Sequence, residues 1–433
     1  MRLSSAPPPS ALIDQIETLP TDEPNWLSQA YRCRLITPLY GGGVKPGEVD
    51  PEMPIRASAI RGQLRFWWRL LSARSLSASE MLQREEAIWG GAGNDQPTAS
   101  KVKVHVSDFD APRLEAAHSY PPNPQKAGQM KSWPEIGHWA SGYALFPAQG
   151  KLMTGNREFE NKPRELAREG LTFVLNLATS KRLSTEEQVE VQTALRWWAS
   201  FGGIGARTRR GLGAVHIESL PPVLPEEVRE LGGMFECQQA TKDPQTAWKR
   251  SVDRLRHFRQ GELVGRNKKA ADSQSPAGRS LWPEADALRA LSGESSARHA
   301  ARIVHADAFP RAAFGLPIVF HFNNPKNDSS REPRDHVLEP HDISRDHKRD
   351  RMASPLILRP YWNGREWLPA ALLLPGWRAA LRVDLKFKGQ QYIPQRWPDD
   401  QGAQKALSSR IRPMLDRGTD PLSAFMAFFA EGK

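Results

Sequence analysis

The sequence has too little cysteine for a disulfide framework. Cys33 and Cys237 are the only two cysteines in 433 residues, which excludes a cysteine-based zinc site and favours a reducing compartment. Long apolar runs are also missing, because Ala370–Leu374 stops at Pro375, far short of a membrane span. Pro7–Pro9 stands where a signal peptide would need its apolar core. We therefore expect a cytoplasmic protein with no membrane partner.

Nucleotide-binding motifs are incomplete as well. The glycine loop Gly41–Gly47 is not closed by Gly-Lys-Ser/Thr and contains no full G-x-G-x-x-G, so neither nucleotide hydrolysis nor a dinucleotide cofactor is inferred. Residues 331–351 hold three histidines but equal numbers of acidic and basic residues. We interpret that stretch as a solvated loop rather than a metal site. No cofactor and no metal are expected.

What the chain does have is length and positive charge. With 433 residues it is too long for one ordinary core, and two domains are expected. The net charge is +11 and the isoelectric point is about 9.7. This balance favours an acidic partner such as nucleic acid over a small neutral substrate.

The most informative stretch, Met53–Ser79, contains five arginines and no acidic residue. Ser58 is a candidate N-cap for a helix. The apolar residues that follow recur at helical spacing on one face; they are Ile60, Leu64, Trp67, Trp68 and Leu71. At 100° per residue, Arg61, Arg65 and Arg69 form a second stripe beside that face. The spacing predicts a helix that packs through its indoles and presents a row of guanidiniums.

Directly before this helix lies the loop Gly41–Gly47, which has little side-chain bulk. Gly42 and Gly43 leave the backbone accessible, and Lys45 supplies one positive charge. Glycine loops that precede helices often hold phosphates through backbone N–H groups. A nucleic-acid backbone could lie along this loop and the arginine stripe. The alternative is a solvated basic face whose charges are neutralised by acidic residues from another segment.

A second glycine-rich stretch, Phe201–Gly213, has five glycines around Arg207, Arg209 and Arg210 and is followed by a short strand. Glycine allows a ligand to approach the backbone closely, and guanidiniums offer fork-shaped donors to phosphate. The alternative is a β-turn with a basic tip.

Pro221, Pro222 and Pro225 mark the expected domain boundary. The N-terminal domain then covers residues 1–220, with an arm at 1–28 and an insertion at 107–150 that is rich in proline, glycine and tryptophan. The C-terminal domain covers residues 221–433. Strands are predicted over 26–37, 101–106 and 171–177, and a helix with a capping box begins at Ser184.

These motifs together resemble the RAMP superfamily of CRISPR proteins. The resemblance rests on Arg56–Arg69 and on the glycine-rich loop Gly202–Gly213. Within that superfamily the chain is most similar to the first Cmr subunits of type III-B (Cmr) effector complexes. Three further stretches carry this narrower likeness: Gly278–Glu284 (Gly-Arg-Ser-Leu-Trp-Pro-Glu), Phe309–Pro317 and Arg351–Leu358. The likeness covers residues 30–360.

The resemblance implies an α+β fold with two ferredoxin-like (RRM-like) domains, each an antiparallel sheet with helices on one face. It also implies a non-catalytic subunit of an antiviral ribonucleoprotein, with guide RNA, target RNA and other Cmr subunits as partners. This subunit would hold the 3′ part of the guide and the target paired to it. The RNA-binding residues expected on both grounds are Arg56, Ser58, Arg61, Arg65, Gly42, Gly43, Lys45, Arg207, Arg209 and Arg210.

Two other functions remain open at this point. Related subunits cut RNA with a loop carboxylate, and Glu48, Asp50 and Glu52 precede the arginine helix, so an endoribonuclease using Asp50 is the main alternative. An unrelated enzyme acting on an anionic metabolite has no complete motif behind it. The sequence has no Gly-Gly-Asp-Asp, which argues against the cyclase-polymerase subunit of such complexes.

Overall fold

An antiparallel four-stranded sheet organises the first half of the molecule. The computed structural model describes residues 25–92, 97–268, 279–295, 308–322, 332–341 and 350–432. Its main sheet has the strand order β10-β1-β9-β2, with β1 at Trp26–Leu35, β2 at Val102–Ser107, β9 at Thr172–Ser180 and β10 at Val215–Ile217. The three strands predicted from the sequence are confirmed, with ends that differ by up to three residues.

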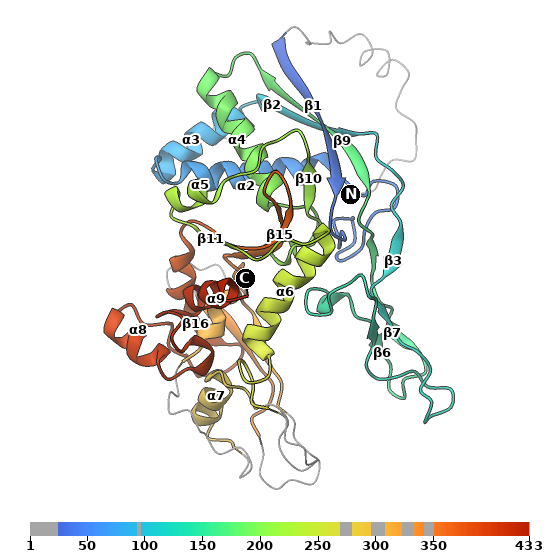
Figure 1. Cartoon of the computed structure of the whole chain (residues 1–433), viewed down its shortest axis with the longest axis vertical. Coiled ribbons are helices and arrows are strands. Elements are labelled where there is room, and N and C mark those ends of the chain that lie inside the picture. The colour runs from blue at the N-terminus through green and yellow to red at the C-terminus, as the bar shows by residue number, and fades with distance from the viewer. Residues whose placement is uncertain are drawn as a thin grey trace.

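Helices cover one face of this sheet. They are α2 (Ala57–Ser72), α3 (Ala78–Trp89) and α4 (Thr185–Phe201), and Figure 1 shows all three to the left of β1 and β9. Ser184 and Glu187 form the expected capping box at the start of α4. The chain order is strand, helix, strand, strand, helix, strand once α3 and the insertions are set aside, which is the ferredoxin-like pattern.

The predicted insertion is built from short hairpins. Residues 107–167 contain β3 (Leu114–Ala116), β4 (His118–Ser119), β5 (Glu135–Ile136), β6 (Lys151–Leu152), β7 (Phe159–Asn161) and β8 (Glu165–Ala167), which pair as β3-β8, β4-β5 and β6-β7. A small core lies inside this region and includes Trp139, Leu145 and Leu166. It also takes in Trp248 from the second half, so the insertion is packed against the rest of the protein.

The second half contains two three-stranded antiparallel sheets among its described residues, with orders β11-β15-β14 and β12-β13-β16. Their strands are β11 (Met234–Cys237), β12 (Ile318–Phe320), β13 (His336–His341), β14 (Leu356–Trp362), β15 (Trp367–Leu373) and β16 (Asp384–Phe387). The helices are α5 (Pro225–Glu230), α6 (Pro244–Gln260), α7 (Glu284–Ser292), α8 (Gln401–Ser408) and α9 (Pro421–Ala430). The expected α+β class with antiparallel sheets is confirmed.

The prediction of a solvated loop over residues 331–351 is partly wrong. Residues 336–341 form β13, a mostly buried strand between β12 and β16. Leu338 is fully buried opposite Ile318 and Phe387, so tertiary packing overrides the local charge density. His347 lies outside the described residues, as do most of the N-terminal arm and Gly278.

One apolar core runs from the first sheet into the second half. Phe201 at the end of α4 stacks on Tyr361 of β14 with ring centroids 6.0 Å apart, and Phe235 of β11 packs against both. The same cluster includes Trp67, Trp197 and residues of β14 and β15. This packing fixes the start of the second glycine-rich stretch, Phe201–Gly213, next to β14. In the described part of the chain, no helix is both long and apolar enough to span a membrane.

Candidate functional site

The tryptophan helix packs as the sequence predicts. Trp67 and Trp68 of α2 are buried, and Trp67 lies 6.0 Å from Trp197 of α4 between ring centroids. The Trp68 indole N–H donates to the carboxylate of Glu190, also on α4, over 2.8 Å. Both indoles therefore belong to the α2–α4 contact and are not available to stack on a base.

The arginine stripe of α2 is largely paired inside the protein. Glu85 of α3 is 3% exposed and accepts hydrogen bonds from the Arg65 Nε at 2.7 Å and the Arg69 Nε at 2.6 Å. Arg61 donates to the Trp89 carbonyl. Burial works to raise the pKa of Glu85, but hydrogen bonds from Arg69 and Arg65 outweigh it and hold that pKa below its usual value. An acidic residue from another segment, Glu85, therefore neutralises part of this basic stripe, as the alternative reading of the sequence expected.

The start of α2 differs from the prediction. Ser58 is the second residue of the helix, and the N-cap is Arg56, whose side chain makes no capping hydrogen bond. The expected serine cap is therefore wrong by two residues, and exposed Ser58 makes no side-chain hydrogen bond to another described residue. Arg56 forms an ion pair with Asp50 over 3.6 Å. Arg56, Arg61 and Arg65 thus all have protein partners, so the predicted row of free phosphate donors is not present.

The first glycine loop keeps several backbone donors free. Gly41, Gly42 and Gly47 have positive φ angles, and the Gly43 N–H is used within the loop, donating to the Glu48 carbonyl at 2.8 Å. By contrast, the N–H groups of Gly42, Val44 and Lys45 donate to no protein group among the described residues. All three residues are exposed. Successive unpaired N–H groups beside a lysine can hold a phosphate.

The structure brings the two glycine loops together. The Ala206 N–H donates to the Tyr40 carbonyl at 2.7 Å, and the Gly213 N–H donates to the Pro38 carbonyl at 2.8 Å. A Cβ added at Gly205 would lie 2.7 Å from the Tyr40 carbonyl oxygen and 3.2 Å from that of Gly41. Two segments far apart in sequence are therefore in backbone contact, and only small residues fit where they cross.

Arg209 and Arg210 point into the second half instead of into solvent. Arg209 donates to the Ser354 carbonyl at 3.0 Å, and Arg210 donates to the carbonyls of Leu356 and Phe314, each at 3.3 Å. Burial lowers the pKa of both guanidiniums to about 10. These contacts hold the loop against β14, and contact of the two half-buried residues with phosphate stays a prediction.

These guanidiniums nevertheless keep their charge. Neutral carbonyls accept their hydrogen bonds, and among the described residues none of Arg207, Arg209, Arg210 and Arg259 has a carboxylate partner. Arg207, Arg209 and Arg259 all lie close enough to Arg210 to depress its pKa further, after burial. We call these four residues the arginine cluster. Uncompensated like charges at such short range favour a bound anion.

Two members of the arginine cluster have unused donors. The Nε atoms of Arg207 and Arg259 are buried and lack hydrogen-bond partners. Arg207 has a φ of +61°, so its backbone is left-handed, an uncommon conformation for a residue other than glycine. Arg259, at the end of α6, donates to the Tyr143 hydroxyl at 3.0 Å. Arg207 is the predicted site residue that remains best placed to meet an anion.

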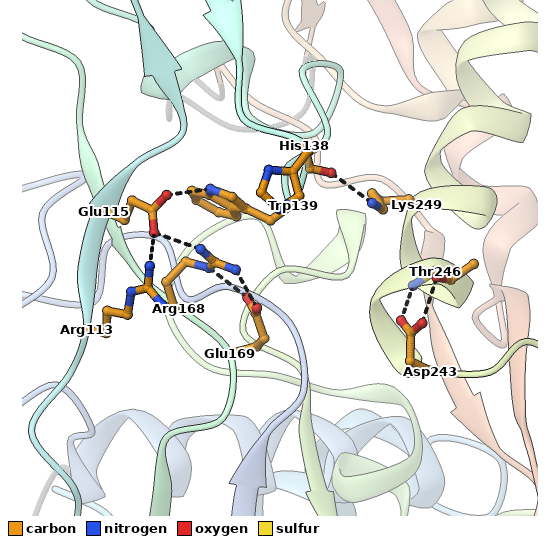
Figure 2. A network of polar contacts seen from close by, with 9 residues as sticks. All are labelled: Arg113, Glu115, His138, Trp139, Arg168, Glu169, Asp243, Thr246 and Lys249. Carbon is orange, nitrogen blue, oxygen red and sulfur yellow. Dashed lines mark hydrogen bonds and ion pairs between the residues drawn. The ribbon is translucent and has the colours of Figure 1, made fainter.

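Polar contacts within the insertion, and one from the insertion to α6, are drawn in Figure 2. Arg168, just after β8, bridges the carboxylates of Glu115 and Glu169 at 2.7 and 2.8 Å, and its guanidinium lies 4.2 Å from the centre of the Trp139 ring. Lys249 of α6 donates to the His138 carbonyl at 2.9 Å. These contacts hold residues 138–143 against α6, which places Tyr143 beside Arg259.

A buried arginine that the sequence analysis did not select holds the glycine-rich loop in place. Arg359 of β14 donates to the carbonyls of Gly202 at 2.7 Å and Val215 at 3.2 Å. Burial lowers its pKa to about 9. Its signal in the sequence is a charged residue inside the apolar strand Leu356–Trp362. Arg259 and Tyr143 were missed because they come from α6 and the insertion, far from either glycine loop in sequence.

Comparison with known families gives one match in this part of the chain. The model of the RAMP superfamily matches residues 32–216. These residues are therefore similar to the RAMP superfamily, and we call them the RAMP region. The matched residues run from β1 to β10, so the RAMP region contains the four-stranded sheet, α2 to α4 and both glycine loops. The superfamily resemblance seen in the sequence is confirmed.

Solved structures similar to the chain include two Cmr proteins and a chain of a type III-B Cmr complex. Cmr1 from Pyrococcus furiosus in its apo form is 14% identical with a TM-score of 0.39, and the match covers 86% of this chain and 90% of that one. A chain of the type III-B Cmr-beta complex bound to cognate target RNA is 13% identical with a TM-score of 0.27, covering 48% and 64%. Cmr6 from Pyrococcus furiosus is 15% identical with a TM-score of 0.23, covering 44% and 98%. No curated protein sequence matches the chain.

The acidic residues before α2 have structural partners in the RAMP region. Asp50 accepts hydrogen bonds from the N–H groups of Glu52 at 3.0 Å and Met53 at 3.1 Å. The Met53 N–H, then the Glu52 N–H, lower the pKa of Asp50, which makes it a weaker base. Glu48 is paired with Arg164. In the described ranges, no group of three His, Cys, Asp or Glu side chains is placed to hold a metal ion.

Proposed function

We propose that this chain is a non-catalytic RNA-binding subunit of a type III-B CRISPR ribonucleoprotein. It holds the 3′ region of the guide RNA, the target RNA paired to it, or both, and other Cmr subunits are its neighbours in the cytoplasm. The observation that carries the RNA-binding part is the arginine cluster, which has no carboxylate partner in the described structure. Three of its members, Arg207, Arg209 and Arg210, lie on the glycine-rich loop that contacts Gly41–Gly47, and Arg259 lies on α6. The assignment to type III-B rests on the sequence motifs named above.

The chemistry of this site suits a backbone contact. Guanidiniums and free N–H groups bind phosphate oxygens, which carry no sequence information. A subunit that accepts many guides requires such contacts. Gly42, Val44 and Lys45 supply the backbone donors, and Arg207 supplies the charge. In this proposal Arg209, Arg210 and Arg359 set the shape of the loop and add to its positive field.

The proposal includes two ferredoxin-like domains, with the boundary near Pro221. In the second half, β11, α6, β14, β15 and α9 follow in the order strand, helix, strand, strand, helix, and the sheet order β11-β15-β14 corresponds to three of the four ferredoxin-like strands. The β12-β13-β16 sheet is then an addition to this domain.

RNA binding by variants in which two arginines are replaced by uncharged glutamines tests the site. The full chain carrying R207Q and R259Q is compared with one carrying R365Q and R412Q, two exposed arginines without an ion pair in the described structure. Both variants lose two positive charges. Fluorescence anisotropy with a labelled guide–target RNA should show weaker binding for R207Q/R259Q alone. The slope of log K against log salt should become shallower by about 1.8 if two phosphate contacts to the duplex are lost.

Equal affinities for the two variants would overturn this site. Thermal unfolding of each variant separates a lost contact from a lost fold, since the midpoint of R207Q/R259Q should stay within a few degrees of the unchanged protein. Catalysis is tested separately by incubating the protein with guide and target RNA with and without Mg²⁺. No cleavage is expected, and cleavage that disappears in D50A would show that the alternative, an endoribonuclease, is right.

A further inference from the structure

The face of the main sheet that α2 and α4 leave uncovered has an unusual charge distribution. Side chains alternate across a strand, and on β1 the buried Tyr31, Cys33 and Leu35 face the helices while Arg32 and Arg34 are exposed on the other side. None of the residues in β1, β2, β9 and β10 is Asp or Glu. We call this second side the open face.

Strand register places the cations of the open face along a diagonal. Lys103 of β2 lies in register with Ala178 of β9, which pairs with Ser28 of β1. Two residues further along β2, His105 aligns with Asn176. The diagonal continues through Arg32 to Arg34 on β1, and Arg34 pairs with His216 of β10. Lys103, His105, Arg32 and Arg34 are all exposed.

The contacts on this face leave the cations without carboxylate partners. Among the described residues, Arg32, Arg34 and Lys103 form no ion pair, and Lys103 places its ammonium 4.0 Å from the centre of the Trp26 ring. That contact shows that β1 and β2 side chains meet above the same surface. The nearby carboxylate of Asp110 accepts from Thr172 at the end of β9. The open face therefore carries positive charge, and its four strands contain no acidic residue that could neutralise it.

A planar aromatic group continues the diagonal at its β10 end. His216 lies 5.8 Å from Trp362 and 5.0 Å from Trp367 between ring centroids, and all three rings are partly exposed. Burial, followed by the charge of Arg359, lowers the pKa of His216, while the carboxylate of Glu218 just beyond β10 acts in the opposite direction. This group offers ring surface beside the cation Arg34.

We propose that the open face binds a single-stranded stretch of RNA. Its phosphates contact Arg32, Arg34 and Lys103, and one base stacks against the group formed by His216, Trp362 and Trp367. This surface is separate from the glycine loops and goes beyond the function proposed above. RNA fits better than a protein partner because most residues between the cations are small or polar. They are Ser28, Ala30, Asn176 and Ala178, and half-buried Val174, in register with Arg32, is the larger apolar residue beside them. A protein interface would need apolar anchors there. Flat cationic surfaces with stacking rings suit single strands.

Charge reversal tests this proposal. The full chain carrying R32E and R34E is compared with one carrying K405E and R412E, two exposed cations that form no ion pair in the described ranges. Both variants change net charge by the same amount, so a general charge effect is controlled. With a fluorescent single-stranded uridine oligonucleotide, R32E/R34E should bind about tenfold more weakly than the control variant, with a shallower salt dependence. Equal binding by the two variants, or no binding by the unchanged protein, would overturn the proposal.

A second measurement locates the strand. Cross-linking with a 4-thiouridine oligonucleotide followed by peptide mapping should label residues of β1, β2 or the Trp362–Trp367 turn. Labels confined to the glycine loops would refute binding on the open face. The variant R207Q/R259Q, measured in the same assay, keeps the two proposals apart. If it retains affinity while R32E/R34E loses it, the open face stands and the glycine-loop site fails.

Discussion

Gly213 offers the sharpest test of how closely the glycine-rich loop is packed. Its φ is +64°, and a Cβ added there would lie 1.9 Å from the Ile204 carbonyl oxygen, well inside contact distance. Gly128 has nearly the same backbone angle, +69°, but an added Cβ would meet no atom within 4 Å. G128A therefore carries the cost of a left-handed alanine alone, about 1 kcal/mol, whereas G213A carries that cost and a steric clash.

The clash can be relieved only by moving backbone that is hydrogen-bonded. Gly213 accepts from the Ile204 N–H at 2.9 Å and donates to the Pro38 carbonyl at 2.8 Å. Losing both bonds costs about 1–3 kcal/mol at 0.5–1.5 kcal/mol each. Local strain adds about 1 kcal/mol more. We therefore expect G213A to be about 2–4 kcal/mol less stable than G128A.

Thermal unfolding followed by circular dichroism measures this difference. G213A should unfold several degrees below G128A, and it should also bind RNA more weakly because the Gly205–Arg207 segment shifts with Ile204. Equal unfolding midpoints for the two variants would refute the close approach of the loop. A lower midpoint with unchanged RNA affinity would leave the packing argument intact but separate the loop from RNA binding.

Two further substitutions probe the neighbouring networks. E85Q removes the buried carboxylate shared by Arg65 and Arg69 and should cost about 2 kcal/mol at pH 7, less than a fully buried pair because both arginines are partly exposed. Because the folded pKa of Glu85 is lowered, its contribution exists above its unfolded pKa and is lost as pH falls through the folded pKa. The midpoints of E85Q and the unchanged protein should thus converge below about pH 4; a constant gap would contradict this. Y143F removes the hydroxyl that accepts from Arg259 and should cost about 1 kcal/mol, with RNA affinity by anisotropy lowered less than in R207Q/R259Q. A larger loss in Y143F would mean that the hydroxyl itself meets the ligand.

Local signals in the sequence predicted the elements of the RAMP region well. The period-two pattern of Tyr31, Cys33 and Leu35 gave β1, and the Ser184–Glu187 capping box gave the start of α4. The indole face of α2 was predicted because its spacing is helical. In each case the information lies within one turn or one strand, so a single sequence contains it.

Partners that come from distant segments could not be predicted. Arg65 and Arg69 looked like free phosphate donors because Glu85, on the next helix, becomes their neighbour only after α2 and α3 pack. Arg209 and Arg210 likewise meet carbonyls more than 100 residues away. The two glycine loops, more than 150 residues apart in sequence, meet through the Ala206–Tyr40 and Gly213–Pro38 bonds. Whether RNA binds there stays a prediction.

The kind of acceptor, more than the number of arginines, separates the two basic regions. On α2, a carboxylate accepts from Arg65 and Arg69, so one charge of the pair is cancelled and the field outside is weak. On the glycine-rich loop, Arg209 and Arg210 donate to carbonyls, which satisfy the hydrogen bonds but cancel no charge. Their pKa values of about 10 leave them protonated at neutral pH. Buried charge of this kind is costly unless an anion approaches, so a phosphate beside Arg207 would relieve a repulsion that the folded chain otherwise retains.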